Sequence, residues 1–236
     1  ANVTLKPADI DSGIIFVRTD LPGKPEIKAG INSLASAEKT PRRTTIENNG
    51  AQVQTIEHLM AALSGLGICN LRVELDNNEL PGLDGSSLKY LDIFNQAGIK
   101  DQNKIRDSFS VKDPIFIEEG KASIMALPAQ EFKVSYTLDY NLFERKTEFV
   151  ELSFSSPEIF AQEIAPARTF CLESEANELR RNGLGLGANY ENTLVLADDG
   201  SVIKNKVRFP DEFVRHKVLD LIGDLNLLGL GLKAHI

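Results

Sequence analysis

The stretch that decides the fold reads Phe209-Pro210-Asp211-Glu212-Phe213-Val214-Arg215-His216-Lys217-Val218-Leu219-Asp220-Leu221-Ile222-Gly223-Asp224-Leu225. Its apolar residues recur at helical spacing and predict a helix from about Asp211 to Leu228 that docks on a core. His216, Asp220 and Asp224 recur every four residues and therefore share one face of this helix. A histidine and an aspartate one turn apart can bind one cation. On spacing alone, however, a solvated stripe in which the two side chains pair is the commoner outcome. Gly223 costs a helix roughly 1 kcal/mol relative to alanine, which indicates close approach by a neighbouring element.

The first half of the chain predicts strands followed by helices. Strands are expected at 13–18 and 70–75, a hairpin over 44–55, and helices at 56–64 and 87–97. The hairpin turns at Asn48-Asn49-Gly50, because Asn-Gly supplies the positive φ that a tight turn requires. Thr55 is the expected N-cap of the helix that follows.

The second half repeats this order. We expect strands near 115–117, 123–127, 133–138 and 148–154, helical segments at 159–164 and 173–181, and a hairpin around Asp199-Gly200. The polar run 100–104 is the expected boundary between an N-terminal domain, 1–104, and a C-terminal domain, 105–236. Strands and helices segregated in this way are typical of the α+β class.

Composition and charge exclude several classes of function. The 236 residues include 34 acidic and 26 basic side chains, a formal charge of -8. Such a surface is unsuited to general nucleic-acid binding, which depends on Lys and Arg. No apolar run reaches the roughly 18 residues of a membrane helix, and no signal peptide opens the chain. Two cysteines, Cys69 and Cys171, suit a reducing cytosol, and Cys69 is expected to be buried. We therefore expect a cytoplasmic protein.

Glu57 and His58 open the helix predicted after Thr55. In one interpretation, Glu57 complements the helix dipole and His58 is exposed beside it. In the other, His58 is a third metal ligand beside His216 and Asp220, and Glu57 is a general base acting on a metal-bound water. Neighbouring helix residues point about 100° apart, so Glu57 would stand beside the ligand instead of sharing its role.

Two further segments are less informative. Gly183-x-Gly185-x-Gly187 lacks the ending of a phosphate-binding loop and is interpreted as a flexible turn or a channel wall. Phe and Leu residues between Phe170 and Val195 would normally be core, but they could also line a slot for a lipid tail. Cys171 has no histidine near it in the sequence, which gives a thiol nucleophile little support.

Several stretches together resemble one family, the UDP-3-O-acyl-N-acetylglucosamine deacetylases of lipid A synthesis. The matching stretches lie in register over almost all of 13–229: Thr55-Ile56-Glu57-His58-Leu59-Met60-Ala61-Ala62-Leu63, Gly65-Leu66-Gly67-Ile68-Cys69-Asn70, Glu79-Leu80-Pro81-Gly82-Leu83-Asp84-Gly85-Ser86, Ala167-Arg168-Thr169-Phe170, and the whole of 209–225. The Glu-His-Leu and His-Lys-x-x-Asp motifs, in this order and at this distance, are highly specific.

The resemblance implies a zinc enzyme that removes the N-acetyl group of UDP-3-O-acyl-N-acetylglucosamine, giving acetate and the free 2-amine. It implies two similar domains, each a small, mostly antiparallel sheet packed on a pair of helices, with the active site between them. The partner is then this small UDP-linked substrate, with no nucleic acid and no membrane span, and the protein is expected to be a monomer. Iron in place of zinc stays open.

Site roles carry over residue by residue. The resemblance implies that the zinc ligands are His58, His216 and Asp220, that Glu57 is the general base, and that Thr169 contacts the oxyanion. Lys217 matches a lysine that contacts the substrate, and Asp224 matches the carboxylate that orients a protonated histidine. The acyl-chain passage is expected to be lined by Phe170, Leu172, Tyr190 and Val195.

The ends of the chain depart from the family's pattern. The family's general-acid histidine follows the last helix in a Gly-His segment, a position that would fall beyond Ile236, and His235 lacks the preceding glycine. The family's first strand would precede Ala1. We expect a fragment of a complete enzyme; the alternative is a non-catalytic metal- or ligand-binding homologue that lacks the general acid.

Overall fold

The computed structural model describes residues 1–38, 40–139, 147–181 and 187–236. They divide into two compact units. The first comprises 1–81, 90–107 and 220–231, and the second comprises 82–89, 108–219 and 232–236. Each unit combines small sheets with a few helices, so the α+β class predicted from the sequence is confirmed. The division expected from the sequence is different, into continuous domains 1–104 and 105–236, and that division stays a prediction.

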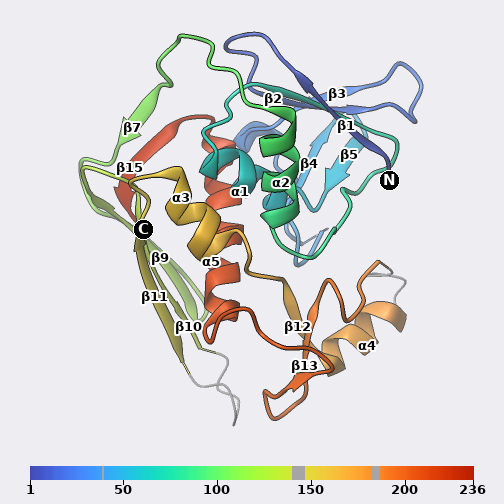
Figure 1. Cartoon of the computed structure of the whole chain (residues 1–236), viewed down its shortest axis with the longest axis vertical. Helices are drawn as coiled ribbons and strands as arrows, with labels where there is room; N and C mark the ends of the chain where they lie inside the picture. Colours follow the sequence, from blue (N-terminus) through green and yellow to red (C-terminus); the bar gives the residue numbers. More distant parts are fainter. Residues whose placement is uncertain (39, 140–146, 182–186) are drawn as a thin grey trace. The chain divides into compact units, whose positions relative to one another are not determined.

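The first unit is built on a four-stranded sheet and a hairpin (Figure 1). The sheet order is β1-β6-β2-β3, in which β2 and β6 are parallel and the outer pairs are antiparallel. The elements of this unit are β1 (Val3–Pro7), β2 (Ile14–Arg18), β3 (Glu26–Lys28), η1 (Ile31–Ser33), β4 (Thr45–Asn48), β5 (Ala51–Gln54), α1 (Glu57–Gly65), β6 (Leu71–Leu75), most of α2 (Leu88–Ala97) and η3 (Asn226–Leu228).

The β4–β5 hairpin turns where the sequence predicts. Asn49 and Gly50 have φ angles of 48° and 83°, and Asn48 pairs with Ala51 across the turn. The predicted N-cap is wrong: α1 begins after Ile56, Thr55 has a left-handed φ of 59°, and its hydroxyl donates to Glu79 at 2.7 Å. The hydroxyl of Thr55 therefore bonds the carboxylate of Glu79 and does not cap the helix.

Helix α1 is buried on every side. Residues 57–63 are all buried, including Glu57 and His58. A helix without a solvent face normally carries apolar residues throughout. Two ionisable side chains at its start are therefore the exception that needs a functional or structural reason.

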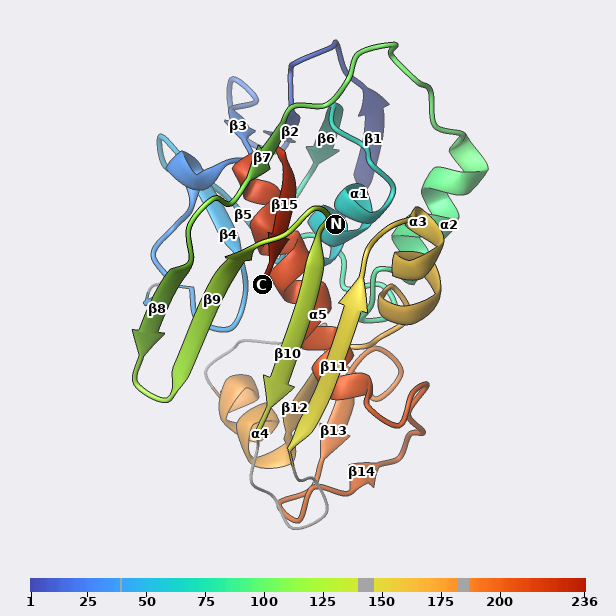
Figure 2. The same ribbon diagram turned by 90° about the vertical axis from the view of Figure 1, so that its left-hand side faces the viewer.

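The second unit contains a six-stranded and a three-stranded sheet. The larger has the order β11-β10-β15-β9-β8, with β7 paired to β15, and Figure 2 shows β15 between the β8–β9 and β10–β11 hairpins. The smaller has the order β12-β13-β14. The elements are β7 (Ser108–Ser110), β8 (Ile115–Glu119), β9 (Ala122–Pro128), β10 (Lys133–Leu138), β11 (Glu148–Ser153), α3 (Pro157–Ile159), η2 (Phe160–Ile164), β12 (Phe170–Leu172), α4 (Glu173–Arg181), β13 (Leu194–Leu196), β14 (Val202–Ile203) and β15 (Gly231–His235).

Helix α5 (Glu212–Leu225) is the helix predicted from the 209–225 stretch, and it contributes residues to both units. Val218 is fully buried, as its apolar spacing predicts, but Leu228 is 39% exposed in the turn that follows. Cys69 is only half-buried, so the expectation that it is a core residue is wrong; its thiol lies 3.3 Å from the carbonyl of Gly67 in a loop. Within the described ranges, no helix combines the length and apolar character needed to cross a membrane.

Candidate metal centre and its surroundings

Three potential metal ligands gather at helices α1 and α5. His216 and Asp220 lie one turn apart on α5, and His58 is the second residue of α1. His58 Nε2 lies 3.7 Å from Asp220 Oδ1. One ligand atom from each of the three residues lies within 4.8 Å of the others. Two imidazole nitrogens and one carboxylate form a donor set typical of catalytic zinc.

The environment of His216 fixes which ring nitrogen can bind a metal. Its Nδ1 lies 3.1 Å from the backbone carbonyl of Ala167, and the ring is buried. A carbonyl oxygen only accepts hydrogen bonds, so Nδ1 carries a hydrogen, and in the neutral ring Nε2 then carries the lone pair. Metal-ligating histidines are commonly oriented by such a bond from the other ring nitrogen.

Glu57 is a buried carboxyl group with an unusual protonation equilibrium. Burial raises its pKa to about 8, and the negative charge of Asp220 acts in the same direction. The backbone N–H of Thr44 donates to its Oε2 at 3.1 Å and opposes this rise. A cation bound by the neighbouring His58 and Asp220 would also lower the pKa. The carboxyl group can therefore exchange a proton in the neutral range, as a general base requires.

Close backbone packing sets the distance between α1 and the end of α5. A Cβ placed on Gly223 would lie 2.2 Å from the carbonyl oxygen of Glu57. The close approach expected at this glycine from the sequence is therefore confirmed. Nearby, the amide of Asn226 donates to the carbonyl of Met60 at 3.0 Å and ties the same two segments.

Asp224 lies one turn beyond Asp220 on α5 and is exposed. The hydroxyl of Thr44 donates to its Oδ1 at 2.5 Å. Sequence reasoning did not identify Thr44, because no local pattern connects two residues 180 positions apart.

Thr169 is held by its backbone against the 81–86 loop. Its N–H donates to the carbonyl of Gly85 at 2.7 Å, and its carbonyl accepts the N–H of Leu194 at 2.9 Å. Gly85 has a φ of 80°, and a Cβ there would lie 1.7 Å from the carbonyl oxygen of Asn192. Only glycine fits such a position, which gives the Asp84-Gly85-Ser86 motif a physical reason.

A buried ion pair lies beside Thr169 and was also missed by sequence reasoning. Glu212 Oε1 accepts hydrogen bonds from Nε and from the backbone N–H of Arg168, at 2.9 and 3.0 Å. Both side chains are buried, that of Glu212 completely. Glu212 is one turn before His216 on α5, so the pair joins the start of this helix to the 167–169 segment. A glutamate in the first turn of a helix is so common that sequence alone gives no signal of this partner.

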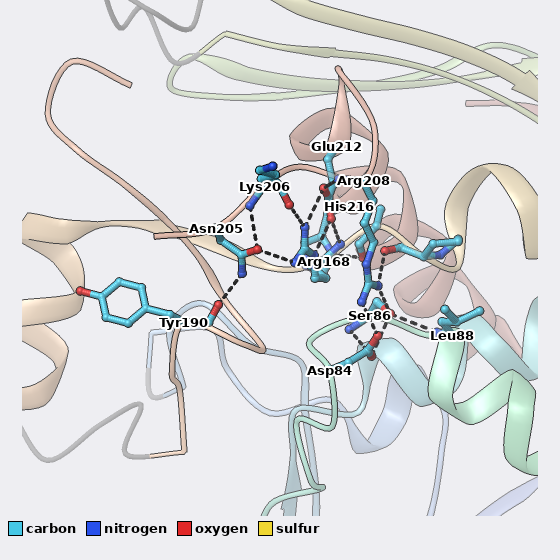
Figure 3. A network of polar contacts seen from close by, with 12 residues as sticks. Asp84, Ser86, Leu88, Arg168, Tyr190, Asn205, Lys206, Arg208, Glu212 and His216 are labelled. Carbon is cyan, nitrogen blue, oxygen red and sulfur yellow. Dashed lines mark hydrogen bonds and ion pairs between the residues drawn. The ribbon is translucent and has the colours of Figure 1, made fainter. Parts of the chain in front are cut away.

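Figure 3 shows how this network continues. The guanidinium of Arg168 also donates to the carbonyl of Lys206 at 2.6 Å. Arg208 donates to the carboxylate of Asp84 at 3.0 Å and to the carbonyl of Pro166 at 2.8 Å. The turn before α5 is thereby fixed to the loop that carries Gly85.

The expected substrate-contacting residues occupy different environments. The ammonium of Lys217 lies 5.7 Å from the ring centre of Phe170. Phe170 itself is buried in a cluster with Leu194, Leu196 and Phe213, against which Leu172 packs.

Tyr190 and Val195 belong to the segment expected to line the acyl-chain passage. The ammonium of Lys204 lies 4.8 Å from the ring centre of the half-buried Tyr190. Val195 is buried and pairs with Cys171 between β12 and β13. Their role as passage residues, like that of Phe170, stays a prediction. Gly183 and Gly185 of the glycine-rich motif lie outside the described residues.

Comparison with known proteins identifies the family. The family model described as UDP-3-O-acyl N-acetylglycosamine deacetylase matches residues 1–236. Proteins named UDP-3-O-acyl-N-acetylglucosamine deacetylase are similar to this chain over nearly its whole length. That of Coxiella burnetii (strain Dugway 5J108-111) is 39% identical over 232 residues, which are 98% of this chain and 75% of the relative. That of Geotalea uraniireducens (strain Rf4) is 40% identical and that of Citrifermentans bemidjiense is 38% identical, each over 234 residues, 99% of this chain and 75% of the relative. The resemblance seen in the motifs is thus confirmed over the whole sequence, and the chain belongs to the UDP-3-O-acyl N-acetylglycosamine deacetylase family.

Proposed function

We propose that the chain hydrolyses the N-acetyl group of UDP-3-O-acyl-N-acetylglucosamine in lipid A biosynthesis, releasing acetate and the free 2-amine, with zinc as cofactor. The observation that carries the proposal is the family match across residues 1–236, supported by relatives that carry the name of this activity. None of the comparisons favours the alternative of a non-catalytic homologue.

The zinc ion would be held by His58, His216 and Asp220. The donor set supports this choice, and the bond from His216 to Ala167 directs the other ring nitrogen toward a ligand role. Three protein ligands leave one coordination position for water or substrate, as in other catalytic zinc sites. When bound, zinc acidifies water and polarises a carbonyl group. Iron with the same ligands would keep the site and change the cofactor.

The residues of the chain then have separate parts in the reaction. As the oxygen of the attacking water adds to the acetyl carbon, Glu57 takes a proton from that water. Thr169 donates to the oxygen that becomes negative, which stabilises the charge where it develops. The C–N bond breaks, acetate leaves, and the amine takes up a proton. We assign Asp224 the part that the family resemblance implies, orienting a protonated histidine for that last transfer.

The remaining assignments concern binding of the substrate. Lys217 would contact the glucosamine or the diphosphate, because it matches the substrate-contacting lysine of the family and directly follows the proposed ligand His216. Arg215, on the other side of His216, already pairs with Glu163 and Asp211. The acyl chain would pass along the segment from Phe170 to Val195, with Leu172 and Tyr190 among its walls. We further propose that the protein acts in the cytoplasm as a monomer.

The proposal is tested by loading the purified product of the complete gene with one equivalent of zinc and measuring acetate release. Acetate is expected from UDP-3-O-acyl-N-acetylglucosamine, and far less from UDP-N-acetylglucosamine, which lacks the acyl chain. Metal content is measured on the same samples, before and after chelation. A protein that binds no metal, or that holds zinc and releases no acetate, would contradict the proposal.

A further inference from the structure

Thr44 contacts the candidate site through each of its three polar groups. Its N–H donates to Glu57 Oε2 at 3.1 Å, and its carbonyl accepts the N–H of Ile56 at 3.3 Å. Its hydroxyl donates to Asp224 Oδ1 at 2.5 Å. Thr44 directly precedes β4, which is fixed by its pairing with β5. One residue at the base of the β4–β5 hairpin therefore holds the start of α1 and the last turn of α5.

The two carboxylates that Thr44 contacts have different proposed parts in the reaction. Glu57 is the base that acts first, and Asp224 belongs to the proton transfer that ends the reaction. Each carboxylate can rotate about its own side-chain bonds. If the side chain is already fixed before the reaction, the entropic cost of ordering it does not add to the activation barrier. A hydrogen bond to a charged acceptor is among the stronger ones that a protein can use for this purpose.

We infer that Thr44 is a positioning residue of the deacetylase reaction, and that its hydroxyl orients Asp224 while its N–H orients Glu57. The inference rests on the proposed function, because it assigns Thr44 a part in that same reaction. Thr44 itself touches neither the proposed metal ligands nor the reacting atoms, so its effect passes through the two carboxylates.

The neighbouring threonine provides a matched control. Thr45 is buried, and its hydroxyl makes no hydrogen bond within the described part of the chain. Thr44→Val and Thr45→Val make the same chemical change one residue apart. Both variants keep the backbone N–H, so the bond from residue 44 to Glu57 survives and only the hydroxyl is tested.

The experiment measures kcat and KM of the zinc-loaded product of the complete gene, in which the histidine partner of Asp224 is expected, for wild type, both valine variants and Thr44→Ser. Thr44→Val is expected to lower kcat about 10- to 100-fold, the range corresponding to a hydrogen bond to a charged group. KM and zinc content should change little, because no substrate or metal contact is removed. Thr44→Ser restores the hydroxyl and should recover most of the rate, while Thr45→Val should keep kcat within about twofold of wild type.

A second comparison separates positioning from a general structural role. If Thr44 acts through Asp224, then Thr44→Val should cost almost nothing in an Asp224→Ala background. Equal losses in both backgrounds, or a Thr44→Val enzyme with wild-type kcat, would overturn the inference.

Crystal structures of Thr44→Val and Thr45→Val test the geometry without any activity. The carboxylate of Asp224 is expected to rotate away in the first variant only. If it keeps its place in Thr44→Val, then the hydroxyl does not hold it. An inactive wild-type enzyme whose Asp224 nevertheless moves in Thr44→Val would refute the proposed function and leave the positioning contact standing.

Discussion

Gly223→Ala adds a single methyl group at the point where α5 meets the start of α1. The new Cβ would lie 2.2 Å from the carbonyl oxygen and 2.9 Å from the carbonyl carbon of Glu57. Real Cβ atoms essentially never come closer than 3.0 Å to such atoms. The obstacle is backbone, which cannot swing aside as a side chain can. The helices must therefore separate by at least about 0.8 Å, the difference between 3.0 and 2.2 Å.

This displacement is large compared with the tolerance of a metal site. Zinc–ligand distances vary by only about 0.2 Å. His58 follows Glu57 on α1, and Asp220 is one turn before Gly223 on α5, so separation moves one ligand away from the other. Overpacking costs about 1–3 kcal/mol, while alanine gains about 1 kcal/mol over glycine in a helix. The expected net loss of stability is therefore about 0–2 kcal/mol, whereas zinc affinity should fall about 10- to 100-fold, as it does when the support of a ligand is disturbed.

Competition with a chromophoric chelator measures the zinc affinity, and urea unfolding of the metal-free protein measures stability. Gly30→Ala is the matched control, because its Cβ would have no neighbour closer than 3.9 Å and its φ of 176° is extended backbone. That variant should bind zinc as the wild type does. A Gly223→Ala protein with unchanged zinc affinity, stabilised by the helix propensity of alanine, would refute the reasoning.

Three further variants test the roles of individual side chains. Glu57→Ala should keep its zinc while kcat falls about 10²–10⁴-fold, the usual loss for a general acid–base group; loss of metal, or an unchanged rate, would contradict its assignment as the base. His58→Ala should instead lose zinc in elemental analysis, and stoichiometric retention would remove it from the ligand set. Glu212→Ala leaves Arg168 as an uncompensated buried charge and should lower the free energy of unfolding by about 3–5 kcal/mol. Arg168→Met combined with Glu212→Leu should recover much of that loss. Urea unfolding of the single and the double variant shows whether the unpaired buried charge of Arg168 causes the loss of stability.

Local patterns were sufficient for the elements that carry the site. The helical spacing of the apolar residues in 209–225 predicts α5, and the four-residue spacing of His216, Asp220 and Asp224 places them on one face of it. Asn49-Gly50 predicts the hairpin that ends just before α1. Gly223 was anomalous within a helical pattern, and the structure supplies the neighbour that explains it.

Contacts between distant segments could not be predicted. The Arg168–Glu212 pair joins residues 44 positions apart, and neither side chain has a local feature that names the other. The strand β12 was missed because three residues that pair in parallel with β13 have no alternation long enough to detect. Thr55 was assigned by its residue type, but Glu79, brought near by the fold, takes its hydroxyl.

The contact between Thr44 and Asp224 joins positions separated by 180 residues, and that between Met60 and Asn226 spans 166. During synthesis at about 5–20 residues per second, α1 therefore waits roughly 10 to 35 seconds for its partner segment. Closing so long a loop carries an entropic cost, and contacts of this separation form slowly in folding. Until α5 arrives, the nascent chain holds His58 without its two proposed co-ligands, so tight capture of the proposed zinc ion would have to wait until α5 has been made. The order of translation thus keeps the hydrolytic centre unassembled until the chain that surrounds it has been made.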